Sequence, residues 1–206
     1  MTNQTQAYGL QPVARLDGAV WNDSLRVYFV PASQTNALYV GDPVIKIAGS
    51  ADTAGVNGVD LAAAGTGNKI TGVVCGYVGA CVAGTANPSF FSFSGTPGPV
   101  YRPATTAQDY YVLVNDDPEA QFYIQASAAL AVANVGKNAN LLSGTGSVYT
   151  GWSGWQLNVT GITTTNTLQL RIIGSVPDPL GVPNATGNKF IVQINTHTEL
   201  PNSAGI

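Results

Sequence analysis

The chain has 206 residues, of which 9% are charged and 45% are hydrophobic, and its formal net charge at neutral pH is −3. An ordinary soluble domain carries roughly 25% charged residues, so this composition excludes coiled coils and long solvated helices, and the apolar content excludes charge-driven disorder. Eight basic residues argue against nucleic-acid binding through phosphates.

The predicted elements are strands, identified as runs rich in β-branched and aromatic residues and bounded by Gly, Pro or Asn. In chain order, the strongest runs are 26–31, 43–47, 70–76, 109–114, 121–125, 167–173 and 189–195. Weaker candidates are 38–40, 148–150 and 156–160. In the second strong run, alternation places Val44 and Lys46 on one face and Ile45 and Ile47 on the other.

The clearest supersecondary signal is a hairpin. Two aromatic and β-branched runs, 109–114 and 121–125, are joined by the turn-forming sequence Asn115-Asp116-Asp117-Pro118. Only the alanine-rich segment 126–135 favours a short helix, because it ends before Gly136, where a helix C-cap fits.

Several short strands separated by turn residues predict an all-β fold. We expect an antiparallel β-sandwich, jelly roll or β-barrel body with extended N- and C-terminal arms and long loops. The Gly-, Ala-, Pro- and Thr-rich stretches 50–69, 84–108 and 175–188 are the predicted loops.

The predicted organisation is one β domain with an arm at each end. The N-terminal arm covers 1–12, the domain covers 13–196 with 84–108 as a candidate insertion, and the C-terminal tail covers 197–206. The longest apolar stretch, 70–84, is shorter than the ~20 residues that a membrane helix needs, so no membrane segment is expected.

The two cysteines, Cys75 and Cys81, lie in this apolar stretch. On a straight strand they would share a face about 20 Å apart, which is too far for a disulfide. A turn at Gly76 and Gly79 would bring them together. Both buried free thiols and a disulfide therefore remain open.

Candidate catalytic groups are few. The single histidine, His197, excludes a site built from several histidines, and no nucleophile-elbow sequence accompanies it, so we expect a surface or arm residue. Asp116, Asp117 and Glu119 form the densest acidic cluster, which fits a turn better than a Ca²⁺ loop or an acid/base pair. We predict no catalytic residue, metal site or cofactor, and no enzymatic activity.

Two tryptophans, Trp152 and Trp155, are three residues apart with Tyr149 nearby. They could form a sugar-stacking platform. Large aromatic side chains more often anchor a core or a subunit contact, and we favour that interpretation.

Seven segments, in this order, resemble small structural proteins of tailed-bacteriophage heads. They are 7–18, 28–33 with 39–44, 110–118 with 122–125, 136–141 and 189–195. The resemblance spans most of the chain and is to capsid decoration, or cement, proteins. Segments 50–108 and 143–165 resemble nothing that we can name.

The resemblance implies a non-enzymatic virion protein that is made in the host cytoplasm and binds the outer capsid surface. Its partners would be the major capsid protein and itself, as a homotrimer or alternatively a homodimer, with no nucleic acid and no membrane. The expected contact residues are Tyr8, Leu10, Pro12, Trp152, Trp155, His197, Leu200 and Ile206. The alternative is a carbohydrate-binding module on the virion surface that uses Trp152 and Trp155.

Overall fold

The computed structural model describes residues 5–81, 100–104, 107–176, 184–201 and 205. These residues form fourteen strands and one short 3-10 helix, which confirms the predicted all-β body. The described part of the chain has no helix with the length and apolar character that a membrane crossing requires.

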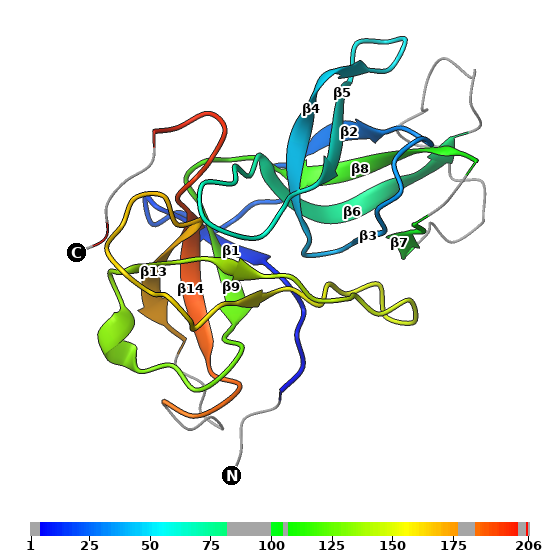
Figure 1. Cartoon of the computed structure of the whole chain (residues 1–206). Coiled ribbons are helices and arrows are strands. Elements are labelled where there is room, and N and C mark those ends of the chain that lie inside the picture. Colours follow the sequence, from blue (N-terminus) through cyan, green and yellow to red (C-terminus); the bar gives the residue numbers. More distant parts are fainter. Residues whose placement is uncertain (1–4, 82–99, 105–106, 177–183, 202–204, 206) are drawn as a thin grey trace.

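Five strands close into a barrel in the order β2-β5-β4-β6-β8 (Figure 1). Their bounds are β2 (Arg26–Val30), β4 (Pro43–Ala51), β5 (Asn57–Leu61), β6 (Gly72–Cys81) and β8 (Asp109–Asn115). Neighbouring strands run antiparallel except β2 and β5, which pair in parallel at Phe29 and Gly58. Closure removes the exposed strand edges that a weakly charged protein could not protect by repulsion.

Five further strands form an antiparallel sheet in the order β1-β9-β14-β13-β10. Their bounds are β1 (Gln11–Arg15), β9 (Ala120–Gln125), β10 (Asn138–Ala139), β13 (Leu170–Ser175) and β14 (Lys189–Ile194). The first strand of the chain pairs with β9 from its middle, and β9 pairs with β14 from its end, so long-range contacts hold the sheet together.

Two small sheets and a helical turn complete the fold. One sheet pairs β3 (Leu38–Tyr39) with β7 (Tyr101–Arg102), and the other pairs β11 (Leu141–Leu142) with β12 (Gln156–Leu157). The 3-10 helix η1 covers Val132–Asn134.

The barrel and the sheet each have a hydrophobic cluster, and β4 and β6 form a wall between the two clusters. Val44 and Val74 belong to the barrel cluster. Their chain neighbours Ile45 and Val73 contact the other cluster, which contains the buried residues of the sheet. Alternation along a strand therefore gives both clusters a face of the same wall.

Strands lie at all seven strongly predicted runs, and at 38–40 and 156–160. The run 148–150 forms a turn instead. The predicted loop 50–69 contains β5, and the predicted helix 126–135 shortens to η1. Cys75 is a free thiol, and burial raises its pKa to about 12.

The predicted hairpin is wrong although both of its strands exist. β8 pairs with β2 and β6 in the barrel, whereas β9 pairs with β1 and β14 in the sheet. The segment 116–119 is therefore a crossover from the barrel to the sheet. Turn-forming residues suit a hairpin turn and a crossover equally well, because each connection requires only a sharp change of chain direction.

The predicted arms are partly wrong, because parts of both pack against the body. Leu10 is buried in the sheet cluster, and Gln11 and Pro12 begin β1. At the other end, His197 is buried, and the N–H of Gly205 donates to the carbonyl of Thr164 at 2.9 Å.

Candidate functional site

The segment 143–155, called the tip here, leaves the sheet side between β11 and β12 and reaches across to the barrel side. It appears as the yellow loop in Figure 1. Val40, just after β3, donates its N–H to Gly151 O and accepts the N–H of Ser153, both at 2.9 Å. The tip is thereby docked beside β3, although it connects β11 to β12.

Close backbone contacts fix the shape of the tip. The N–H of Ser147 donates to Trp152 O at 2.9 Å, and the N–H of Gly151 donates to Ser147 O at 2.8 Å. A side chain at Gly146 would collide with the ring of Tyr39 and with Trp152 O. Gly151 has a φ of +73°, which most other residues avoid.

The tip presents an apolar surface to solvent. Tyr149 is 93% exposed, Val148 46% and Trp152 41%, and neighbouring Val100 is 52% exposed. We call these four residues the tip surface. Residues 143–155 include no charged side chain. A rigid, uncharged surface with exposed Tyr and Trp has the character of a protein-contact site.

The predicted pairing of Trp152 with Trp155 is not formed. Trp155 is only 3% exposed and belongs to the sheet cluster, whereas Trp152 faces solvent. The Trp155 N–H donates to Ser153 Oγ at 3.1 Å, in a tight turn that directs the chain toward β12. The two rings therefore cannot form one stacking platform.

The N-terminal contact candidates differ in exposure. Leu10 has no exposed surface, so its prediction as an outward contact residue is wrong. Tyr8 and Pro12 are half-buried, and the ammonium of Lys189 lies 5.9 Å from the centre of the Tyr8 ring. Leu200 is 41% exposed, and Ile206 lies outside the described residues.

His197 is the clearest correction among the candidate residues, because the structure buries it where we expected a surface position. A parallel bridge joins its backbone to Ile70, and its Nδ1 accepts the N–H of Glu199 at 3.1 Å. Burial lowers its pKa, while the backbone of Thr71 and the charge of Glu199 oppose that shift. Nε2 has no hydrogen-bond partner among the described residues.

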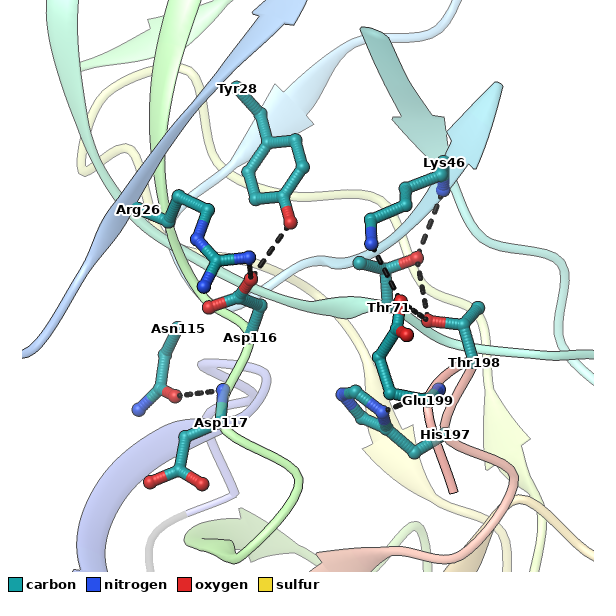
Figure 2. A network of polar contacts seen from close by, with 10 residues as sticks. All are labelled: Arg26, Tyr28, Lys46, Thr71, Asn115, Asp116, Asp117, His197, Thr198 and Glu199. Carbon is teal, nitrogen blue, oxygen red and sulfur yellow. Dashed lines mark hydrogen bonds and ion pairs between the residues drawn. The ribbon is translucent and has the colours of Figure 1, made fainter. Parts of the chain in front are cut away.

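His197 belongs to a polar junction between the barrel and the chain segments beside it (Figure 2). On one side, Asp116 pairs with Arg26 at 2.9 Å and accepts the hydroxyl proton of Tyr28 at 2.8 Å. Burial is the largest cause that raises the pKa of Tyr28, to about 12. These contacts hold the start of the crossover against β2.

On the other side of the junction, the C-terminal segment is held against β4. Lys46 Nζ donates to Glu199 at 2.6 Å, and this hydrogen bond is the main cause that lowers the pKa of Glu199. The backbone N–H of Lys46 donates to Thr71 Oγ1 at 3.0 Å, and Thr198 reaches the same hydroxyl at 3.4 Å.

The rest of the acidic cluster is also paired. Asp117 and Glu119 contact Arg15 at 3.2 and 3.1 Å, at the end of β1. With Asp116 on Arg26, the crossover is tied to the barrel at one end and to the sheet at the other. The cluster therefore connects two parts of the fold.

The junction shows the chemistry of a structural clasp. Its carboxylates already have cationic partners, and His197 is buried with its Nδ1 occupied by a backbone donor. The described residues contain no group of three or more His, Cys, Asp or Glu side chains that could hold a metal ion. The tip surface is thus the stronger candidate for a functional site.

Comparisons with known proteins leave the site to be interpreted from its own geometry: no family model, curated protein or solved structure matches the chain.

Proposed function

We propose that this chain is a structural virion protein that binds the outer surface of a tailed-bacteriophage capsid and bridges neighbouring major capsid protein subunits. The sequence resemblance to head decoration proteins suggests the partner. The proposed role requires shape and contact area, and it requires no reacting group.

The observation that carries the proposal is the tip surface. Tyr149 and Trp152 project from a segment whose backbone is already hydrogen-bonded to the body, so binding would order few additional residues. A contact that requires little ordering retains more of its interaction energy. Large exposed aromatic residues are also the side chains that most often dominate protein interfaces.

The low charge of the tip suits attachment to a particle that meets changing salt concentrations. Ion pairs between exposed groups weaken as salt screens them, whereas apolar contacts do not. We propose assembly as a homotrimer, or alternatively a homodimer. Several weak contacts per oligomer would then combine through effective concentration.

The test measures binding to capsids purified without this protein. Tyr149→Ser and Trp152→Ser remove the two aromatic anchors, and each should weaken binding about 30-fold, the effect of losing one interface hot spot. Sedimentation of labelled protein with the capsids gives the bound fraction at each concentration.

Val20→Ser is the matched control, because Val20 is 80% exposed and lies outside the tip. It should bind as the wild type does. The proposal is contradicted if the double variant Tyr149→Ser/Trp152→Ser saturates capsids normally, or if the protein is absent from purified virions.

The carbohydrate-binding alternative would now rest on Trp152 with Tyr149, because Trp155 is buried. The same variants distinguish the two functions. Retention on host polysaccharide that is lost in Trp152→Ser would favour glycan binding, whereas retention on capsids alone would favour decoration.

A further inference from the structure

Three segments meet where the tip contacts the rest of the molecule. They are the N-terminal segment at Gly9, the turn at Gly41 before β4, and the tip at Ser153. A Cβ at Gly9 would collide with Gly41 O and with the Cβ of Ser153, so the three segments pack directly against one another. The docking of the tip therefore depends on the side chains buried at this three-segment contact.

Asp42, which follows Gly41, lies at this three-segment contact and is 2% exposed. Its Oδ2 accepts the N–H of Tyr39 at 2.8 Å, and the side chain of Ser153 in the tip interacts with the carboxyl in the direction that lowers its pKa. Its Oδ1 is buried without a hydrogen-bond partner among the described residues. A negative charge on this carboxyl would be poorly solvated, which favours the protonated form.

Among the residues that the structure describes, no cation compensates for a charge on Asp42. Tyr39 and Tyr77 interact with it electrostatically, and burial raises the pKa of both phenols, so they stay neutral around pH 7. Tyr8, in the N-terminal segment, also has a pKa raised by burial. Arg102, which Tyr77 also faces, directs its guanidinium NH groups to backbone carbonyls.

Burial raises the pKa of Asp42 to about 7, and the interactions with Ser153 and Tyr39 only partly offset this. If the tip undocked, water would reach the carboxyl and its pKa would return toward the usual value near 3.9. Undocking would therefore release a proton at pH values between the two.

We propose that Asp42 is a protonation-dependent latch for the tip: the tip stays docked beside β3 while the carboxyl is neutral, and it undocks more often once the carboxyl ionises. The sign follows from linkage, because the docked state binds the extra proton. Docking is strongest in acid, weakens as pH rises from about 4 to about 7, and then changes no further. This inference concerns the isolated protein and does not depend on the capsid role.

The first experiment titrates the Asp42 carboxyl carbon by ¹³C NMR in the wild-type protein. The expected midpoint is near pH 7. A midpoint below pH 5 would overturn the proposal, because the carboxyl would then already be ionised between pH 5 and pH 7, where docking is expected to weaken.

The second experiment measures amide hydrogen exchange of Val40 and Ser153, the two N–H groups that dock the tip, corrected for intrinsic exchange rates. Their protection should fall at least tenfold between pH 5 and pH 8.5. In Asp42→Asn, which keeps the shape but cannot ionise, protection should be independent of pH. Equal pH profiles in the variant and the wild type would contradict the latch.

Asp52→Asn is the matched control, because Asp52 also accepts a backbone N–H, that of Val56 at 2.8 Å, in a turn outside the tip. It should keep the wild-type pH profile. Ser153→Ala is the second variant: removing the hydroxyl that joins the tip to Asp42 should lower protection even at pH 5. Unchanged protection at pH 5 would also count against the latch.

Discussion

At the scale of single residues, Arg102 shows how this weakly charged protein accommodates a buried cation. Its side chain has no exposed surface, yet its nearest hydrogen-bond partners are the carbonyls of Asn36, Gln34 and Pro31, at 2.5, 2.7 and 3.1 Å. Tyr110 also lies beneath the guanidinium, 5.9 Å from ring centre to Cζ. One arginine thereby organises the loop that leads from β2 to β3.

Replacing this guanidinium should be costly. Arg102→Met leaves several buried carbonyls without donors, so the free energy of unfolding should fall by about 3 kcal/mol. Urea denaturation followed by circular dichroism measures the change. Lys137→Met, which removes a half-buried cation beside η1, should cost under about 0.5 kcal/mol. Equal losses in the two variants would contradict the assigned role of Arg102.

His197 gives a residue-scale prediction for pH. Burial lowers the pKa of His197 in the folded state. Below the usual histidine pKa, the unfolded chain therefore binds a proton at this residue more readily than the folded protein does. Stability should therefore decline as pH falls below about 6.5, the usual histidine value. His197→Asn, whose amide oxygen can replace Nδ1 as an acceptor, should lose that part of the decline.

The two proteins are compared by urea denaturation at pH 7.5 and pH 5.5. Asp42 titrates in both, so its opposing contribution cancels in the difference. Parallel stability curves for the variant and the wild type would show that the histidine does not contribute.

At the scale of elements, the sequence located the strands well and their partners poorly. Alternation and β-branching are local properties, so β2, β4 and β14 could be predicted from short runs. Partner choice depends on burial against distant residues, which is why β8 and β9 looked like a hairpin. The ion pairs of Asp116 and Asp117 with strands from different sheets cannot be read from spacing.

The tip was missed for a related reason. Its Gly-, Ser- and Thr-rich sequence is typical of a surface loop, and only docking on Val40 makes it a fixed structure. The sequence predicts Trp152 as a contact residue, and its pattern singles out Tyr149 only as a neighbouring aromatic residue. The burial of Trp155 could not be predicted, because both tryptophans are equally apolar and lie in the same loop sequence.

The tip offers an element-scale prediction. Gly146→Ala places a methyl group against the ring of Tyr39 and Trp152 O, so the tip should undock and the free energy of unfolding should fall by roughly 1–3 kcal/mol. Amide exchange of Ser153 reports undocking directly. Gly174→Ala is the control, since a Cβ there meets open space. Similar exchange in both variants would contradict the packing argument.

At the scale of the whole molecule, the shared wall of β4 and β6 predicts that barrel and sheet unfold together. Phe122→Ala in the sheet cluster should lower the Tm by about 10 °C in one calorimetric transition. Val74→Ala in the barrel cluster should shift the same single transition by less. Two separate transitions in either variant would show that the clusters are independent.

The rooting of the tip has a mechanical consequence. Both of its ends continue into β11 and β12 beside the sheet, while its middle is fastened to the residue that follows β3, next to the barrel. A tensile load applied at Tyr149 would divide between the two halves of the molecule. A force on the tip would therefore act on the barrel side and the sheet side at the same time.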